Sequence, residues 1–364
     1  MKNKPLIIDA HQDLAWNMLS FGRDYTRSAE ETRLLERGTK IPAYNGDTLL
    51  GWNNYQDGRV AIIFATLFAS PLRYQEGDWD TQCYANANEA HKIYMAQVDA
   101  YQRLLEERPD RFCTLRSQAD VQSHLQIWED EESTPPVGLV TLMEGAEGVR
   151  SPSELEVWWQ RGVRIIGPAW TGTRFCGGTS EPGPLTKEGY ALLEGMGELG
   201  FMLDISHMDE KAALQALDFY GGPILASHAN CAALLKGADT NRHLSDRVIQ
   251  GMLERDAVIG VIPINKFLLP GWTIKDERNL VPLERVVAHI DHICQTAGDA
   301  NHVGIGSDFD GGFGVQQVPM EIDTVADLQK LVALLDEKGY NTDDIVAILG
   351  QNWHRFLIEN LPPG

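Results

Sequence analysis

Cysteine is scarce in the sequence and follows no pairing pattern. Five cysteines occur in 364 residues, and no two of them form a CxxC motif: Cys83, Cys113, Cys176, Cys231 and Cys294. An odd number of scattered cysteines is typical of reduced, mostly packed thiols rather than of a disulfide framework. We therefore expect a cytoplasmic protein.

The sequence also lacks long hydrophobic runs and an excess of basic residues. No stretch approaches the ~18 apolar residues of a membrane span, no secretory signal precedes Leu6–Ile8, and no hydrophobic tail for a lipid anchor follows Leu361. Lys and Arg number 31 against 52 Asp and Glu, a formal net charge of −21. Such a charge repels phosphate backbones and anionic lipids, so we expect neither nucleic acid nor a membrane surface as a partner.

Short β-rich apolar runs recur along the chain, and amphipathic stretches such as 86–107, 187–199 and 283–297 separate them. Several runs are apolar throughout, as parallel strands buried on both faces are. Eight such units predict a (β/α)8 TIM barrel that forms a single domain over residues 1–364. No GxGxxG follows the first run, which disfavours a dinucleotide-binding sheet. The eight runs are Leu6–Ala10, Val60–Phe68, Val137–Met143, Val163–Gly167, Phe201–Ile205, Pro223–Ala226, Ala257–Ile262 and Val303–Gly306.

Two long segments and the C-terminal tail fall outside this alternation. Ser20–Trp52 and Ser70–Ala85 contain scattered Gly, Arg, Tyr and Pro, so we predict extended irregular loops over the C-terminal face of the barrel. The tail Thr342–Leu361 predicts one or two closing helices, interrupted at Gly350–Asn352.

Metal-binding residue types gather where the predicted strands end. Active sites of (β/α)8 barrels lie at that face, and five of the eight strand ends offer His, Asp or Glu. The alternating geometry of a strand places His11 and Asp13 on one face, where both could bind one ion. The candidate ligands and acids at the strand ends are His11, Asp13, Glu144, His207, His228 and Asp308.

Imidazoles mixed with carboxylates suit Zn²⁺, with Mn²⁺, Co²⁺ or Fe²⁺ as alternatives. Three imidazoles with three carboxylates exceed what one tetrahedral ion needs, so we predict two divalent metal ions, zinc first among the candidates. The other histidines lie in or beside predicted helices or before the last strand, and we interpret them as structural or surface groups: His91, His124, His289, His292, His302 and His354. His243 stays unassigned.

Taken together, the motifs resemble those of the membrane (renal) dipeptidase family, in the amidohydrolase superfamily of metal-dependent barrels. The resemblance follows the order of nearly the whole chain. It rests on Asp9–Leu14, Met143–Gly145, Ser206-His207, Ser227-His228, Asn241-Arg242 and Gly304–Gly312.

The resemblance implies a ligand set. His11 and Asp13 would hold the first metal ion, His207 and His228 the second, and Glu144 would bridge both. It also implies hydrolysis of a dipeptide, with tolerance of a D-residue at the C-terminal position. The partner is then a small dipeptide-like substrate, and a homodimer is an expectation by analogy.

Asp308 would move the proton between a metal-bridged hydroxide and the leaving amine, acting as general base and then acid. Arg242 would bind the free carboxylate of the substrate with its planar fork. A surface ion pair is the alternative interpretation of Arg242. Asp310 and Asp9 fit supporting roles through hydrogen bonds, and Asp204 stays unassigned.

The sequence departs from the family pattern after the fourth strand. Family members have a histidine there that reaches the substrate, but no histidine occurs between Glu144 and His207, and Trp170 stands near that position. Trp170 would border the substrate or simply pack in the pocket wall. Another small amide, a lactone or an amino-bearing compound therefore remains an alternative substrate, and a catalytically silent metal-binding protein is a third hypothesis.

Overall fold

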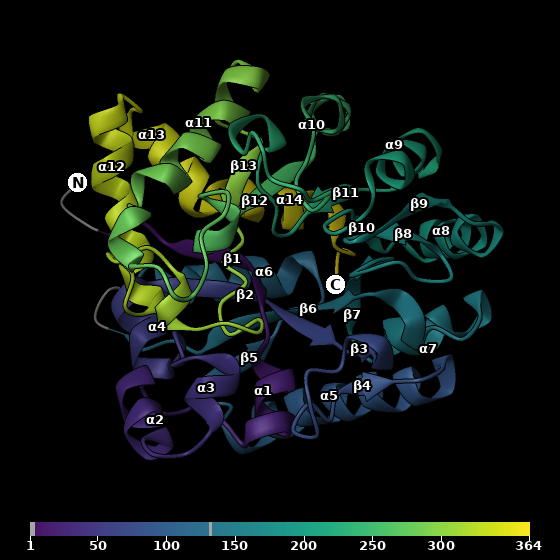
Figure 1. The fold of residues 1–364 in the computed structure, drawn as a ribbon, viewed down its shortest axis with the longest axis horizontal. Coiled ribbons are helices and arrows are strands. Elements are labelled where there is room, and N and C mark those ends of the chain that lie inside the picture. Colours follow the sequence, from purple (N-terminus) through teal and green to yellow (C-terminus); the bar gives the residue numbers. More distant parts are fainter. Residues whose placement is uncertain (1–3, 131–132) are drawn as a thin grey trace.

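The computed structural model describes residues 4–130 and 133–364. Eight parallel strands form a closed barrel, and helices surround it (Figure 1). The predicted runs correspond to these strands with shifts of no more than two residues at either end: β1 (Ile7–Gln12), β2 (Val60–Phe68), β6 (Val137–Glu144), β7 (Val163–Gly167), β10 (Met202–Asp204), β11 (Ile224–Ala226), β12 (Val258–Val261) and β13 (Val303–Ile305).

The pairing between β2 and β6 closes the barrel. Seven register pairs run from Ile62↔Gly138 to Phe68↔Glu144. The first and last barrel strands along the chain are also neighbours, because Asp9 of β1 pairs with Ile305 of β13. An additional strand, β5 (Phe112–Thr114), pairs with the first residues of β6. Because all these pairings are parallel, the carboxyl ends of the eight barrel strands meet at one face.

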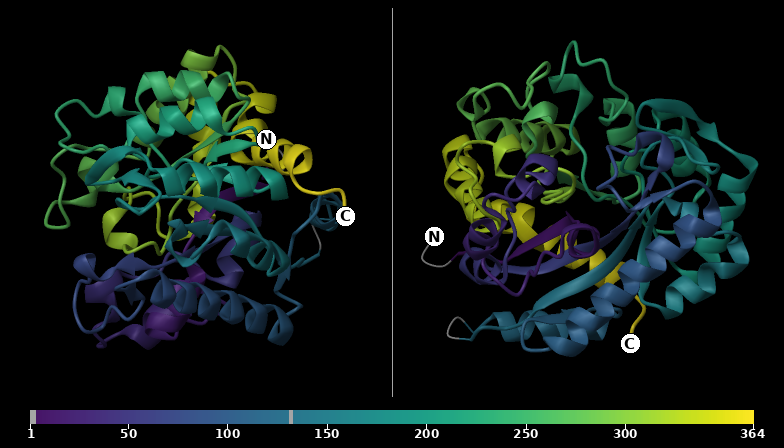
Figure 2. Two further views of the ribbon diagram at one scale, coloured as in Figure 1. Left: turned by 90° about the vertical axis from the view of Figure 1, so that its right-hand side faces the viewer. Right: turned by 60° about the horizontal axis from the view of Figure 1, so that its bottom comes forward.

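The helices of the outer ring begin where polar caps satisfy their free N–H groups. Asn86 accepts from the backbone of residues 88 and 89, and Ser117 forms a capping box with Asp120. The ring and its extensions comprise α5 (Ala87–Glu107), α6 (Gln118–Trp128), α7 (Leu155–Gln160), α8 (Lys187–Leu199), α9 (Glu210–Phe219), α10 (Asp246–Leu253), α11 (Glu284–Ala297) and α12 (Leu331–Lys338). Figure 2 shows them around the strands from two further sides.

The segment after β1 is more regular than the sequence predicted. The prediction of an irregular loop over Ser20–Trp52 is wrong, because α2 (Ala29–Glu36) and α3 (Ile41–Asn45) form within it. Ser28 caps α2 in a capping box with Glu31, a local signal already present in the sequence. With α1 (Leu14–Phe21), these helices lie at one side of the barrel, and α4 (Trp52–Gly58) leads into β2 (Figure 1).

The segment after β2 contains two short paired strands, β3 (Ser70–Pro71) and β4 (Cys83–Tyr84), and a single 3-10 turn, η1 (Leu72–Tyr74). A hairpin of β8 (Cys176–Gly178) and β9 (Glu181–Leu185) follows β7. None of the described helices combines the length and the apolar character that a membrane crossing requires.

The C-terminal tail closes the barrel as predicted. α13 (Thr342–Val346) and α14 (Asn352–Asn360) are joined by a π-helical turn at Ala347–Gln351, so the expected interruption is a wider turn rather than a break. Trp353 of α14 is fully buried and donates its indole N–H to the carbonyl of Ile305 at 3.0 Å. The tail is thus anchored to the strand that precedes the site.

Candidate metal centre and active site

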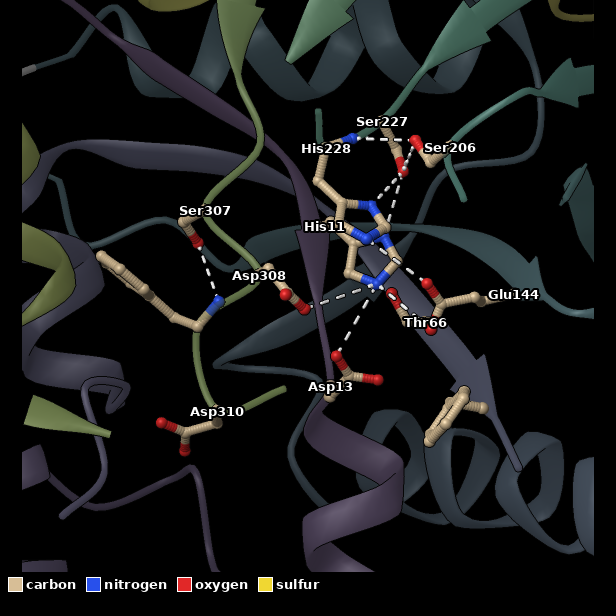
Figure 3. Close-up of polar contacts among 12 residues, drawn as sticks. His11, Asp13, Thr66, Glu144, Ser206, Ser227, His228, Ser307, Asp308 and Asp310 are labelled. Atoms are coloured by element: carbon tan, nitrogen blue, oxygen red, sulfur yellow. Dashed lines mark hydrogen bonds and ion pairs between the residues drawn. The ribbon is translucent and has the colours of Figure 1, made fainter. Parts of the chain in front are cut away.

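Five of the predicted ligands converge at the carboxyl ends of four strands. Figure 3 shows four of them, His11, Asp13, Glu144 and His228. His11 lies in β1, Asp13 is the first residue after that strand, and Glu144 is the last residue of β6. His207 and His228 lie just beyond β10 and β11. All five are buried, with exposed fractions of 9% or less. Residues up to 217 positions apart in sequence (228 minus 11) therefore share one small volume.

Two histidines and Glu144 form one group of potential ligands. Nε2 of His207 lies 2.9 Å from Nε2 of His228. Oε1 of Glu144 lies 3.1 Å and 3.4 Å from these nitrogens. Two ligand atoms about 2.1 Å from one tetrahedral ion are about 3.4 Å from each other. The spacing of the three atoms therefore fits a shared cation.

His11 and Asp13 form a second group with the same glutamate. Nε2 of His11 lies 3.7 Å from Oδ2 of Asp13 and 3.9 Å from Oε2 of Glu144. The two oxygens of Glu144 thus face different groups. This arrangement suits a carboxylate that bridges two ions.

The chemistry of these atoms fits a bound cation. His11 Nε2, Asp13 Oδ1 and Glu144 Oε1 are buried and have no hydrogen-bond partner among the described residues. Burial, and then the neighbouring carboxylates, raise the pKa of Asp13 and of Glu144 well above their usual range. Burial lowers the pKa of His11 to about 3, so its imidazole is neutral and available as a ligand. Unpaired buried carboxylates beside neutral imidazoles are the donors that a divalent metal ion uses.

Asp308 borders the same centre. Oδ1 of Asp308 lies 3.9 Å from His11 Nε2, and its backbone N–H donates to the His11 carbonyl at 3.0 Å. Asp308 has a left-handed backbone with φ +57°. Gly311 leaves room for it, since a Cβ there would lie 2.1 Å from Asp308 Oδ1. Burial raises the pKa of Asp308 to about 7.

Asp310 faces away from the centre (Figure 3). Its Oδ2 accepts from Arg23 Nη1 at 3.1 Å and Tyr25 at 2.8 Å, and from the Thr48 hydroxyl. Its Oδ1 accepts the backbone N–H of Leu49 at 2.9 Å. These bonds occupy both oxygens, so Asp310 holds the loop after β13 against the segment after β1.

Arg242 is buried beneath the opening of the site, with 2% of its surface exposed. One guanidinium nitrogen, Nη2, donates to the His228 carbonyl at 2.8 Å. Nε and Nη1 have no partner within the described part of the chain. The guanidinium also lies 5.5 Å from the ring of Phe267. A fixed guanidinium with two free donors at a hollow is suited to bind a carboxylate.

A hollow of about 230 Å³ opens over Glu144, His207 and Asp308. Arg242 and Trp170, for which substrate contacts remain a prediction, both line it. Aromatic rings form most of its upper walls: Trp16, Tyr44, Phe68, Tyr74, Trp79, Trp170, Phe267 and Phe313. Three of these rings, Tyr44, Tyr74 and Trp79, come from the predicted loop segments 20–52 and 70–85, so those segments extend over the C-terminal face.

Several residues of the site were not found from the sequence. Lys266 lines the hollow beside Arg242, and Thr179 contacts His207, but neither lies in a motif that points to the site. Asp204 and Ser227 were visible beside His207 and His228, yet nothing in the sequence gave them a role. Of the remaining histidines, His243 is half-buried against Phe267, outside the ligand groups.

A sequence model described as membrane dipeptidase (peptidase family M19) matches residues 1–360. The chain belongs to this family. Members of the family are metal-dependent dipeptidases, so the expected class of hydrolase is confirmed. The family uses divalent metal ions, in agreement with the donor groups described above.

Individual relatives are distant from the chain. An uncharacterized protein in the pqqA 5′ region of Klebsiella pneumoniae is 32% identical over 61% of this chain and 81% of its own length. The dipeptidase tcpJ of Claviceps purpurea (strain 20.1) is 26% identical over 83% and 67%. A crystal structure of a Rhodobacter sphaeroides metallo peptidase, liganded with a phosphinate mimic of L-Ala-D-Ala, superposes with a TM-score of 0.78. It is 24% identical and covers 99% of this chain and 100% of its own, so it shares the barrel fold.

Proposed function

We propose that the protein is a dipeptidase with two divalent metal ions, zinc being the first candidate. His11 and Asp13 would hold one ion, His207 and His228 would hold the other, and Glu144 would be shared between them. The position of the two Glu144 oxygens, one facing each group of ligands, is the observation that carries this proposal. Family membership supports it independently.

Bound to these residues, divalent ions would supply a hydroxide at neutral pH and polarise the scissile carbonyl. Asp308 is the general base and acid: its carboxylate takes the proton of the attacking water and delivers it to the leaving amine. Its location beside His11, at the floor of the hollow, supports this role. Arg242 binds the substrate carboxylate through its two free nitrogens and so fixes the peptide bond over the centre.

The substrate is a dipeptide with a free carboxylate, and a C-terminal D-residue is accepted. The aromatic walls favour apolar side chains, because rings at the upper edge of the hollow bury apolar surface of the ligand. Trp170 packs 5.1 Å from Phe68 and 5.6 Å from Tyr74, ring centroid to centroid, so we assign it to the wall beside the substrate.

The test is hydrolysis of matched L-Xaa-L-Xaa and L-Xaa-D-Xaa dipeptides by protein reconstituted with Zn²⁺, with metal content measured on the same sample. We expect two metals per chain and cleavage. Asp308→Asn keeps the shape of the side chain, and we expect it to retain the metals and lose turnover. Asp336→Asn, an exposed carboxylate on α12, is the matched control and stays active. Equal activity of Asp308→Asn and the wild type would refute the assigned mechanism.

Two alternatives are decided by the same experiment. Two bound metals without dipeptide cleavage would move the substrate to another small amide, a lactone or an amino-bearing compound on the same centre. A catalytically silent protein would bind the metals and hydrolyse none of these. The presence of Asp308 beside the ligands favours an active enzyme, because metal binding alone does not need it.

We also propose a cytoplasmic location and a homodimer. All five cysteines are free in the structure, which fits a reducing compartment. Cell fractionation tests the location, and light scattering coupled to size-exclusion chromatography tests the dimer. A secreted protein or a monomer at micromolar concentration would overturn the respective proposal.

A further inference from the structure

The hydroxyl of Ser227 lies behind the metal centre, between two histidines that belong to different ligand groups. Its Oγ is 3.1 Å from Nδ1 of His11 and 2.8 Å from Nδ1 of His228. It also donates to Oδ2 of Asp204 at 2.5 Å. Ser227 is fully buried, so no solvent competes for these contacts. Figure 3 shows the hydroxyl on the far side of both rings from Glu144.

The three shortest of the four contacts of the Ser227 hydroxyl fix its proton inventory; the fourth, to Ser206 Oγ, is longer at 3.3 Å. A serine hydroxyl has one proton and two lone pairs. The proton is directed at Asp204, whose other oxygen, Oδ1, accepts the backbone N–H groups of Ser206 at 2.9 Å and Ser227 at 3.0 Å. Both lone pairs of Ser227 therefore face ring nitrogens, and these nitrogens must donate. His11 and His228 then carry their single proton on Nδ1.

This proton position determines what each ring offers to a metal ion. A neutral imidazole protonated on Nδ1 has its lone pair on Nε2. Nε2 is the atom that faces Glu144 in both histidines, at 3.9 Å for His11 and 3.4 Å for His228. Nε2 of His228 also lies 2.9 Å from Nε2 of His207, so the two nitrogens face the same position.

We propose that Ser227, held by Asp204, is a positioning residue that fixes one ligand of each metal ion in the Nδ1-protonated form. This inference rests on the two-metal assignment of the proposed function. One hydroxyl thus prepares both metal positions at the same time. Removal of that hydroxyl therefore lowers the metal affinity of both positions.

His207 provides an internal comparison. Its Nδ1 contacts the hydroxyl of Thr179 at 3.0 Å, so a different residue supports the third imidazole. Thr179→Val removes that hydroxyl with little change in shape, and its effect is confined to the ion that His207 binds. Ser206→Ala is the matched control for Ser227, because the Ser206 hydroxyl lies 3.3 Å from Ser227 Oγ and makes no hydrogen bond to an imidazole nitrogen within the described part of the chain.

The first test uses metal-free protein and so does not depend on catalysis. Two-bond ¹⁵N–¹H correlations of the histidine rings distinguish the protonated nitrogen from the unprotonated one. We expect His11 and His228 in the wild type to be protonated on Nδ1, and Ser227→Ala to remove this preference in both rings. Ser206→Ala keeps it. Protonation on Nε2 in the wild type would overturn the proposal without any variant.

The second test measures metal affinity by competition with a chelator. We expect Ser227→Ala to bind both ions about 10- to 100-fold more weakly, the usual effect of losing a partner behind a ligand. Thr179→Val weakens one ion only. A Ser227→Ala protein with one unchanged ion would refute the shared role. A wild type that binds no metal at all would instead refute the proposed function, while the ring protonation would still be measured.

Asp204→Asn separates this role from direct ligation by Asp204, which also lies within 4.8 Å of His11 and His228. As the acceptor behind Ser227, Asp204 affects both ions through the two rings. We expect Asp204→Asn to alter the ring protonation of His11 and His228. Loss of metal with unchanged ring protonation would identify Asp204 as a ligand and overturn the proposal.

Discussion

Replacement of Arg242 tests how the substrate is recognised. Its Nε and Nη1 have no partner among the described residues, so a substrate carboxylate can accept two charge-assisted hydrogen bonds. Each such bond contributes about 1.5–3 kcal/mol, and two together about 3–6 kcal/mol. Because 1.4 kcal/mol corresponds to a factor of ten, Arg242→Met lowers kcat/KM for a dipeptide by two to four powers of ten.

The assay compares each dipeptide with its C-terminal amide, which lacks the carboxylate. We expect the wild type to prefer the acid strongly and Arg242→Met to lose that preference. Arg242→Lys keeps the charge but not the planar fork, so it recovers only part of the selectivity. Metal content is measured alongside, because Nη2 of Arg242 also donates to the His228 carbonyl.

Lys266→Met is the matched control, since Lys266 lines the same hollow and carries the same charge. We expect a smaller loss from this change, similar for acid and amide. If Arg242→Met lowered kcat/KM equally for the acid and the amide, carboxylate binding by the guanidinium would be refuted. If Lys266→Met lost as much of the preference for the acid as Arg242→Met, the selectivity would come from the overall positive charge of the hollow rather than from a specific contact with Arg242.

Two further predictions concern stability, measured by urea unfolding in the presence of a chelator. Burial lowers the pKa of His289 to about 3, and its Nδ1 accepts the Cys231 N–H at 3.1 Å. Between pH 6.5 and 3 the unfolded chain therefore binds a proton on this imidazole that the folded chain does not. Lowering the pH from 7 to 4.5 reduces the free energy of unfolding by about 2–3 kcal/mol through this group alone, and His289→Asn makes the free energy of unfolding depend less steeply on pH. An equal pH dependence in the variant and the wild type would contradict this assignment. Arg23→Met leaves the Asp310 and Glu36 carboxylates buried without their partner and lowers the free energy of unfolding by about 3–5 kcal/mol; a loss below about 1 kcal/mol would contradict it.

The fold was largely predictable from local patterns. Each barrel strand is a short apolar run because it is buried on both faces, and that requirement is visible without tertiary information. The same applies to α5 and α8, whose predicted and observed bounds agree to within a residue. α2 was missed although Ser28 and Glu31 carry its capping signal, because scattered Gly, Arg and Pro in the surrounding segment were given more weight.

The candidate site divides in a similar way. The position of His11, Asp13, Glu144, His207 and His228 at strand ends follows from topology, since parallel strands in a barrel bring their carboxyl ends together. Apart from Trp170, the aromatic walls could not be predicted, because four of their eight rings, those of Trp16, Tyr44, Tyr74 and Trp79, come from segments whose paths depend on packing rather than on periodicity. Asp310 shows what the sequence could not predict. Its position close to Asp308 suggested that it supports the site through hydrogen bonds, but its four hydrogen-bond donors come from residues 23–49.

The sequence by itself determined the barrel, the family and the residue types at the metal centre, because strand burial and strand-end placement are local properties that repeat along the chain. Only the tertiary structure decided which atoms face one another. The two orientations of the Glu144 oxygens, the free nitrogens of Arg242 and the contact of one Ser227 hydroxyl with His11 and His228 are such cases. Each depends on distances of a few ångströms between segments far apart in sequence, and such distances are set by packing of the whole barrel.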